Sequence, residues 1–191
     1  MPPKGDVTRQ KILEVATEQA AVRGLAAVSL GDVADAVGMS KSGVFKHFQA
    51  KEALQQALLE QVTGRFVEHV WKPAEALPPG KARLDVIFER WLEWVEREAS
   101  AGGCGLLAFA IELDDQPGPL REGLKEQQLR WHRTIAKEFA ATHAPPLTHE
   151  DASQRAFLLK SILLGYNHSR RLLDDEEARA MAHAAYRRLL A

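Results

Sequence analysis

The sequence predicts an all-α protein, and three observations point to this class. Apolar residues recur at spacings of three and four along nearly the whole chain, whereas the alternation typical of strands is almost absent. Serine or threonine stands directly before several of these amphipathic segments, as helix N-caps do. Glycine or proline follows where they end. By these signals the 191 residues form about nine helices, with no internal repeat.

The first part of the chain predicts short helices in close succession. The first begins near the sixth to eighth residue and ends at Gly24. Ser29 caps a second helix, which ends at Gly38, and Ser40 caps a third. Two short helices joined by a three-residue turn are typical of a helix-turn-helix.

The remaining helices follow from apolar spacing and from the breaks between segments. A fourth helix starts near Lys51 and is expected to end around Trp71, because Pro73 disfavours helix at the residue before it. Residues 73–80 form a linker-like stretch. Five more helices are expected over "RLDVIFERWLEWVERE", through "CGLLAFAIE", from about Leu120, after the cap Thr148, and after the cap Asp174.

The bulk composition limits the functions to consider. The chain has 46% hydrophobic and 27% charged residues and a net charge of −1, which is typical of a globular protein and excludes a uniformly basic nucleic-acid coat. Its single cysteine cannot form an internal disulfide. The N-terminal residues lack the apolar core of a signal peptide, and no window is apolar enough to span a membrane. We therefore expect a cytoplasmic protein without a membrane segment.

Four short motifs are spaced without interruption between Thr8 and about Leu58. They are a glycine with a bulky residue at 24–25, Asp-aliphatic-Ala at 32–34, Gly-aliphatic-Ser at 38–40 and aromatic-x-His-Phe at 45–48. In order and spacing, this stretch resembles the DNA-binding domain of the tetracycline-repressor (TetR) family. Two departures stand out, which are Phe45 where the family has a phosphate-contacting tyrosine, and Gln19-Ala20 where it has Leu-Phe.

The resemblance implies a homodimeric transcriptional regulator, expected to be a repressor. Residues 1–50 would form the helix-turn-helix DNA-binding domain, and residues 51–191 a helical body that binds an effector and dimerises. A small apolar effector would change the separation of the two recognition helices and so release a two-fold symmetric operator. The alternative from another class is a small-molecule-binding helical protein without specific DNA binding.

The residues themselves support a local DNA interface. Residues 38–51 contain three lysines and His47 but no acidic residue. The free N–H groups at the start of the third helix favour an anion, and Gly43 has no Cβ to keep the helix from a base or phosphate. Lysines alone would indicate only a solvated basic face, but the capped helix pair favours DNA.

Roles within this interface follow from position along the helix. Lys41 and Ser42 are placed to read bases, and His47 and Lys51 to contact phosphates. Phe45 and Phe48 are expected to pack the helix onto its neighbours. The predicted DNA-binding set is Ser29, Ser40, Lys41, Ser42, Gly43, Phe45, Lys46, His47 and Lys51.

The C-terminal body contains aromatic stripes that could form either core or the wall of a ligand cavity. If they face one another, they would enclose more space than close packing requires. Polar side chains on the same stripe of the long helix suggest contacts to a ligand's polar group. The predicted pocket is Phe88, Trp91, Trp94, Cys104, Gln128, Trp131, His132 and Ile135. The default for Cys104 is a small buried hydrophobe, and a reactive thiol is the alternative.

The last two helices are expected to supply the dimer interface, because their small residues allow close helix approach; an intrachain core is the alternative. The predicted interface is Phe157, Leu158, Ser161, Ile162, Gly165, Ala178, Ala182 and Ala185.

The sequence contains no pattern typical of a metal site or of a catalytic site. Glu112, Asp114 and Asp115 are expected to be solvated acids at a helix end rather than metal ligands. The histidines are scattered, and only Cys104 could serve as a nucleophile. We therefore expect no enzyme activity, no metal and no cofactor.

Overall fold

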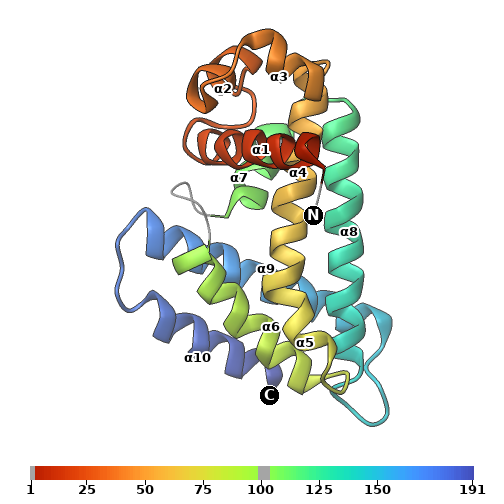
Figure 1. Ribbon diagram of the computed structural model, residues 1–191. Helices are drawn as coiled ribbons and strands as arrows, with labels where there is room; N and C mark the ends of the chain where they lie inside the picture. Colours follow the sequence, from red (N-terminus) through yellow and green to blue (C-terminus); the bar gives the residue numbers. More distant parts are fainter. Residues whose placement is uncertain (1–2, 99–103) are drawn as a thin grey trace. The chain divides into compact units, whose positions relative to one another are not determined.

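The computed structural model describes residues 3–98 and 104–191. These residues form ten α-helical segments and two π-helical turns, which join into nine continuous helices. No strand occurs in the two described ranges, so the all-α prediction is confirmed (Figure 1). Within the same ranges, no helix is both long and apolar enough to cross a membrane.

The chain divides into two units by its internal contacts. The first unit comprises residues 1–65 and 99–124, and the second comprises residues 66–98 and 125–191. The helices in the first unit are α1 (Lys4–Arg23), α2 (Leu30–Val37), α3 (Lys41–His47), nearly all of α4 (Lys51–Phe66), α7 (Gly105–Leu113) and the start of α8 (Pro119–Ala140). The second unit has η1 (Val67–Trp71), α5 (Lys72–Glu75), α6 (Lys81–Glu93), η2 (Trp94–Glu98), the rest of α8, α9 (His149–Arg171) and α10 (Ala178–Leu190).

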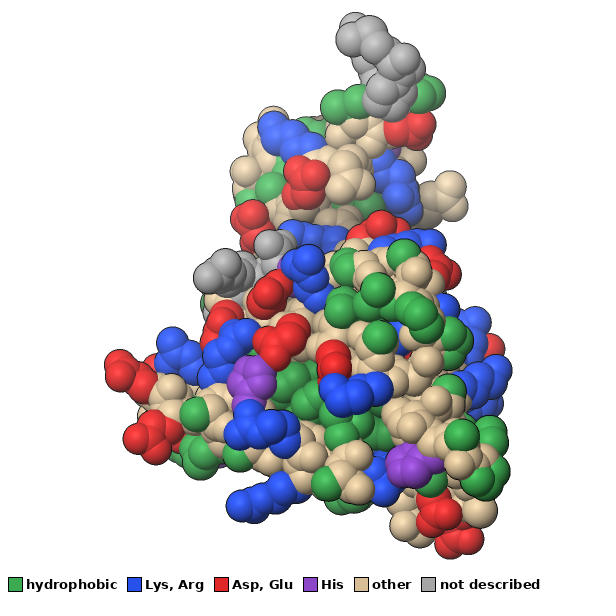
Figure 2. All heavy atoms as spheres, turned by 90° about the horizontal axis from the view of Figure 1, so that it is seen from below, with side chains coloured by type: hydrophobic (Ala, Val, Ile, Leu, Met, Phe, Trp, Pro, Cys, Tyr) green, Lys and Arg blue, Asp and Glu red, His purple; other side chains and the backbone are tan. Residues whose placement is uncertain are grey.

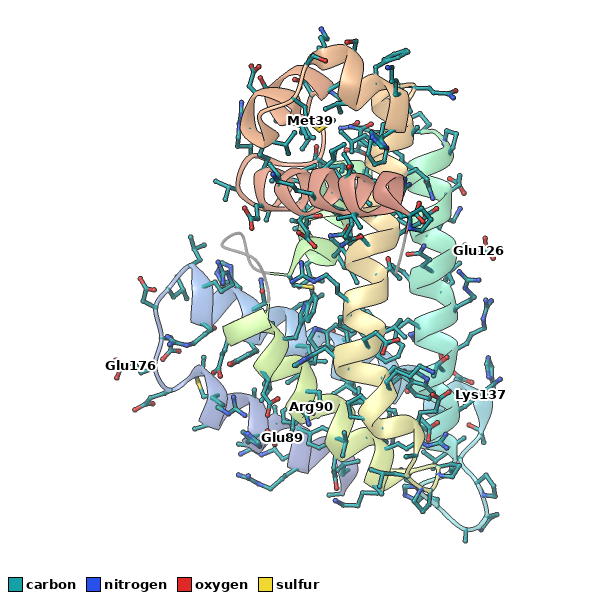
Figure 3. The ribbon with its side chains drawn as sticks, viewed as in Figure 1. Met39, Glu89, Arg90, Glu126, Lys137 and Glu176 are labelled. Carbon is teal, nitrogen blue, oxygen red and sulfur yellow. The ribbon has the colours of Figure 1, made fainter. Side chains whose placement is uncertain are left out.

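Helices α2 and α3 begin at the predicted caps. The Ser29 hydroxyl accepts from the Asp32 N–H at 3.1 Å, and the Ser40 hydroxyl accepts from the Gly43 N–H at 3.1 Å. Each such cap stabilises a helix by about 1 kcal/mol. Gly38 ends α2 at φ +70°, a left-handed conformation that glycine adopts without a steric penalty. Met39 follows in the turn between the two helices (Figure 3).

The core beneath α3 explains why one of its two phenylalanines is buried and the other is not. Val44 and Phe48, one turn apart, are both buried, and the Arg9 guanidinium lies 4.8 Å from the centre of the Phe48 ring. Phe45 is rotated by about 100° from Val44 around the helix, and it is 52% exposed. The prediction that Phe45 packs in the core is therefore wrong, whereas that for Phe48 is confirmed.

The helical run that starts at Lys51 does not end at Trp71 as predicted but continues through α5 to Glu75. The chain accommodates Pro73 by changing its hydrogen-bond pattern, since the Lys72 N–H donates to the Val67 carbonyl five residues back. Pro73 then lies in the first turn of α5, where its missing N–H costs little.

Asp174 does not cap the last helix as predicted, because the N-cap residue of α10 is Glu177 and no side chain caps this helix. The carboxylate of Asp175, not Asp174, accepts from the Glu177 N–H at 2.9 Å, and α10 begins at Ala178. The other predicted cap, Thr148, is confirmed: its hydroxyl accepts from the Asp151 N–H at 3.1 Å.

Contacts between α6, α9 and α10 organise the second unit. Helices α9 and α10 pack along each other, and the Phe88 ring on α6 stacks on Tyr186 with centroids 4.2 Å apart. The Tyr186 hydroxyl donates to Asp85 at 3.0 Å. Burial, followed by the nearby Asp85 charge, raises the pKa of Tyr186 well above its usual value.

A polar network joins the same three helices. The Arg179 guanidinium lies 2.9 Å from Glu89, which is labelled in Figure 3, and 2.9 Å from Glu96. The Tyr166 hydroxyl donates to Glu96 at 2.6 Å. Burial opposes the ionisation of Glu96, but the Tyr166 hydroxyl and the Arg179 guanidinium outweigh it and hold the pKa of this carboxyl below its usual value. The helices are thus joined through one charged carboxylate.

Candidate functional site

The exposed side of α3 is the candidate nucleic-acid interface. Lys41, Ser42, Phe45 and Lys46 are exposed and fall at spacings of one, four and five residues, which places them on a single face of the helix. We name these four residues the recognition face. The first turn of α3 has no acidic residue. Two cations, a hydroxyl and an apolar ring are together suited to phosphates, base edges and thymine methyl groups.

Three of the other predicted DNA-binding residues have partners inside the first unit. Ser29 and Ser40 cap α2 and α3, and the Ser40 hydroxyl lies 3.1 Å from that of Ser42. The Lys51 ammonium donates to the Ala26 carbonyl. His47, at the end of α3, is half-buried. The outward-facing part of the predicted set is therefore the recognition face.

Gly43 lies where the packing around the α3 cap leaves little room for a side chain. A Cβ at this position would lie 3.2 Å from the Met39 methyl carbon and 3.2 Å from the Ser40 hydroxyl. Both neighbours belong to the turn that sets the angle between α2 and α3. Glycine at this position thus has an intramolecular cause, in addition to any close approach to DNA.

A feature that sequence reasoning missed is a clamp on the turn between α1 and α2. The Glu112 carboxylate of α7 accepts from the Leu25 N–H at 2.7 Å and also from the Ala26 N–H. On the α4 side, Gln55 donates to the Leu25 carbonyl at 3.0 Å, and Lys51 donates to Ala26. Sequence gave no signal, because 86 and 87 residues separate Glu112 from its two partners.

Five of the eight predicted pocket residues lie together in the second unit. They border a cavity of about 20 Å³ between α6, α8 and α9, which is lined by Trp91, Gln128, Trp131, His132, Ile135, Ala156, Leu159 and Lys160. This volume is close to that of one water molecule. The larger aromatic space expected from the sequence is therefore not present there, and the rings pack against one another instead.

The packing of these rings is centred on Phe66. Its ring meets Trp91, Trp131 and Trp94 edge-on, at centroid distances of 5.1, 5.5 and 5.7 Å. Trp71 completes the group at 6.0 Å from Trp131. We call these five residues the aromatic cluster. The π-helical turns η1 and η2 begin directly after Phe66 and at Trp94, and single π turns inside helices are frequent at functional sites.

The other predicted pocket residues lie elsewhere. Phe88 packs on Tyr186, and Trp94 belongs to the aromatic cluster without bordering the cavity. Cys104 is a buried cysteine in the first unit and forms no disulfide. Among the described residues, no group of three or more His, Cys, Asp or Glu is arranged to hold a metal ion.

The predicted dimer residues divide by exposure. Phe157 and Leu158 on α9 are 63% and 48% exposed, and Ser161 and Gly165 are exposed beside them. Ile162 and Ala185 are half-buried. Ala178 and Ala182 are buried within the chain itself, so their assignment to an intermolecular surface is corrected. Their small size instead permits the close packing of α10 inside the second unit.

Charge elsewhere on the surface is mixed. Figure 2 shows lysine and arginine side chains interspersed with acidic and hydrophobic ones across one face of the molecule. This agrees with a net charge of −1 and with a nucleic-acid contact confined to a local patch.

A capped helix-turn-helix within an all-α chain defines a DNA-binding regulator of the helix-turn-helix class. The profile described as "Bacterial regulatory proteins, tetR family" matches residues 12–58, and that described as "Tetracyclin repressor-like, C-terminal domain" matches residues 80–186. The second match alone covers more than half of the 191 residues. The chain belongs to the TetR family of transcriptional regulators, which bind DNA and are not enzymes.

Individual proteins resemble the chain over different lengths. The transcriptional activator FasR of Mycolicibacterium smegmatis is 27% identical over 94 residues, which are 49% of this chain but only 43% of FasR. A TetR regulator from Chloroflexus aurantiacus superposes with a TM-score of 0.79 at 25% identity, over 98% of this chain and 94% of its own. AibR, solved with isovaleryl coenzyme A and operator DNA, has a TM-score of 0.71 at 21% identity, over 91% and 95% of the two chains.

Proposed function

We propose that the protein is a ligand-responsive repressor that binds a two-fold symmetric operator as a homodimer. In this proposal residues 1–50 contact DNA, and residues 51–191 bind the effector and form the dimer. A small, mostly apolar effector in the body lowers operator affinity by shifting the protein toward a conformation in which the two recognition helices no longer match the half-sites.

The observation that carries the proposal is the recognition face. Lys41 and Ser42 lie on the first turn of α3, where side chains reach base edges when such a helix enters the major groove. Phe45 supplies an exposed apolar ring that can contact a thymine methyl group or a sugar, but it has no hydroxyl for a phosphate. Lys46 is placed for the phosphate backbone.

A dimer is proposed because one short recognition helix contacts only a few base pairs. The occupant we propose for the exposed apolar side of α9 is a second copy of the chain. Phe157, Leu158 and Leu164 on this helix, with Met181 on α10, are 63%, 48%, 40% and 51% exposed. A self-complementary apolar patch of this kind suits an interface around a two-fold axis.

The test begins with selection of DNA from a random pool by the purified protein. Lys41→Ala should then relax base preference at one position of each half-site, a loss of about 1–3 kcal/mol of discrimination. Lys46→Ala should weaken selected and random duplexes alike and lower the log–log salt slope by about one for each half-site. Lys137→Ala, an exposed lysine on α8 (Figure 3), is the control and should leave both quantities unchanged.

Gly43→Val and Lys51→Ala are poorer probes of DNA contact, because each change also disturbs the first unit. Valine would press on Met39 and Ser40, and alanine would remove the bond to the Ala26 carbonyl. A protein that selects no sequence, although folded, would instead be a helical small-molecule-binding protein.

Assembly and the sign of regulation need their own measurements. Sedimentation at micromolar concentration should give twice the chain mass of 21.2 kDa, and Phe157→Glu should shift it toward the monomer. A monomer that still binds its operator tightly contradicts the dimer.

The sign of regulation is tested with a reporter gene placed behind the selected operator, which should be repressed in the absence of effector. Activation of the reporter would contradict a repressor, and FasR bears the name of an activator.

A further inference from the structure

Three tryptophans in the second unit have indole N–H groups without an acceptor. The Nε1 atoms of Trp91, Trp94 and Trp131 are all buried, and within the described residues none of them has a hydrogen-bond partner. Trp91 and Trp94 are only 6% and 4% exposed as whole residues. An indole N–H can only donate, so burial without an acceptor costs free energy that a suitable ligand would return.

The fourth tryptophan of the aromatic cluster differs from these three, because its indole N–H has an acceptor. Trp71 contacts Trp131 ring to edge, and its indole N–H donates to the Glu75 carboxylate. The same kind of ring, in the same cluster, is thus partnered where a carboxylate is available. Trp91 and Trp131 lack such a neighbour, and both border the small cavity.

The charged residues around the cavity also favour a ligand that accepts hydrogen bonds and carries negative charge. Lys160 reaches its rim from α9 and forms no ion pair with any described residue. The lining contains no aspartate or glutamate. His132, the remaining ionisable group, is hydrogen-bonded to Ser153, with 2.8 Å between Nε2 and the hydroxyl. Two unpartnered donors and one cation, with no anion, form a site for an acceptor that carries negative charge.

We propose that this cavity is the polar end of an effector site for an apolar monocarboxylic acid. The carboxylate oxygens accept from the indole N–H groups of Trp91 and Trp131 and lie beside the Lys160 ammonium, while the apolar chain is received among the aromatic rings. The inference rests on the proposed function only in naming the ligand an effector; the binding site itself requires no DNA.

The size of the cavity adds a requirement. About 20 Å³ holds one water molecule and no organic acid. Binding must therefore turn Trp131 or separate α8 from α9, and acid binding is coupled to a change in the packing of the aromatic cluster. The two π turns next to Phe66 and Trp94 border the rings that would have to move, and single π turns inside helices are frequent at functional sites.

Two other classes of ligand that bind to aromatic clusters do not suit this cavity. Aromatic faces attract cations, but a cation here would meet Lys160 and two donors with no carboxylate to offset them. A neutral hydrocarbon would leave both indole N–H groups unpartnered. Charge, with chain length held constant, is therefore the variable that separates the classes.

The experiment uses the full chain without DNA and a series of acids, each compared with an uncharged probe of the same length. Hexanoate, octanoate, decanoate and phenylbutyrate are compared with the corresponding amides, and with octylamine and octyltrimethylammonium, by calorimetry and tryptophan fluorescence. The variants are Trp131→Phe, which keeps a smaller aromatic ring and removes the N–H, and Lys160→Gln, which keeps a polar side chain of similar length and removes the charge. Lys137→Gln is the matched control for the change of charge, because Lys137 is exposed on α8 and does not line the cavity.

At least one acid should bind saturably, quench tryptophan fluorescence and bind about ten-fold more tightly than its amide. Lys160→Gln should reduce acid affinity to about that of the amide, and Trp131→Phe should reduce it about five-fold, with the Lys137→Gln control within about two-fold of wild type. The inference is overturned if no acid binds, if the amine or ammonium binds as well as the acid, or if both site variants bind acids like wild type. Selected-operator binding, measured separately, shows whether the proposed function stands in either case.

Discussion

The two units of the molecule differ in the distance along the chain over which their specific contacts form. In the first unit, the caps of α2 and α3 join residues three apart. In the second unit, the bonds that fix its helices join residues 55, 70 and 101 apart, namely Arg83 to Glu138, Glu96 to Tyr166, and Asp85 to Tyr186. Local contacts can be predicted from neighbouring residues, whereas the others require the fold to be known.

The difference in range also explains the difference in function that we propose. A DNA-reading surface must present a few side chains from one rigid short helix, and local caps suffice to define it. A ligand site needs groups from several helices, so its polar character emerges only when α6, α8 and α9 are brought together.

The largest expected effect separates the two phenylalanines of the local α3 motif. Phe48→Ala should destabilise the protein by about 3–5 kcal/mol, because it removes a buried ring. Phe45→Ala should cost less than about 0.5 kcal/mol, since that ring is exposed, but it should weaken binding to a selected operator. Urea denaturation and duplex titration measure the two effects. Equal destabilisation by both changes would contradict the described burial.

The next effect tests a long-range contact of the second unit. Glu138 is buried and accepts from Arg83 at 3.0 Å and from the Gly80 N–H at 2.8 Å. Glu138→Ala should destabilise the protein by about 3 kcal/mol, because it removes the charge that offsets a half-buried guanidinium and leaves the Gly80 N–H without its acceptor, although two backbone carbonyls still accept from Arg83. Glu126→Ala is the control: this residue lies exposed on the same helix (Figure 3), and its replacement should change stability by less than about 0.5 kcal/mol.

Comparable losses from the two variants would show that the Glu138 contacts do not stabilise the folded chain. Acid binding by the Glu138→Ala variant shows whether this long-range contact of the second unit also serves the proposed ligand site. If Glu138→Ala leaves acid binding intact at low temperature, the bond to Arg83 serves stability alone.

A good deal of the fold followed from the sequence, for reasons that particular residues illustrate. Ser29, Ser40 and Thr148 cap helices because a hydroxyl can accept from an N–H three residues ahead, which is a local event. The prediction at Trp71 was wrong because a proline can be accommodated by a π turn before it. The prediction at Asp174 is wrong because α10 begins three residues later than that cap requires, and the neighbouring Asp175 bonds the Glu177 N–H in the turn before the helix.

The candidate sites were predictable to different degrees. The exposed side of α3 follows from helical spacing once Val44 and Phe48 are known to be buried, although sequence alone placed Phe45 on the wrong side. The cavity was anticipated as an aromatic space, but not its small size, because ring-to-ring packing around Phe66 depends on residues from three segments. Lys160 was missed because nothing near it in sequence relates it to a tryptophan.

The turn at Leu25 and Ala26 departs from the local character of the first unit, because Glu112, Gln55 and Lys51 reach it from distant parts of the chain. The third prediction concerns Glu112. Glu112→Gln keeps the shape of the side chain but replaces one acceptor oxygen by a donor that faces backbone N–H groups. We expect a loss of about 1–3 kcal/mol in stability. Operator affinity should also fall, because the turn leading into α2 loses its clamp.

The control for this change is Asp115→Asn, an exposed acid near the end of the same helix. It removes the same charge without touching the turn and should behave like wild type in denaturation and in duplex titration. If both variants lose operator affinity equally, the lost negative charge is the cause. The Glu112 contacts would then not be needed to hold the turn before α2.

The smallest effect is the alkaline pH dependence of the second unit, which contains both tyrosines of the chain. Burial, followed by a carboxylate partner, raises the pKa of Tyr166 and of Tyr186 above the ordinary value of 10.0. A raised pKa in the folded state means that these phenols contribute stability that is fully present below pH 10 and is lost as pH rises further. Tyrosinate absorbance should therefore stay low at pH 10 and then rise together with the loss of helical circular dichroism.

In Tyr186→Phe, stability at pH 7 should fall by about 1 kcal/mol, because the hydroxyl no longer donates to Asp85. The loss of stability at alkaline pH should also become shallower in this variant. A gradual titration centred on pH 10, with the helices intact, would show that the tyrosines are not held by Glu96 and Asp85.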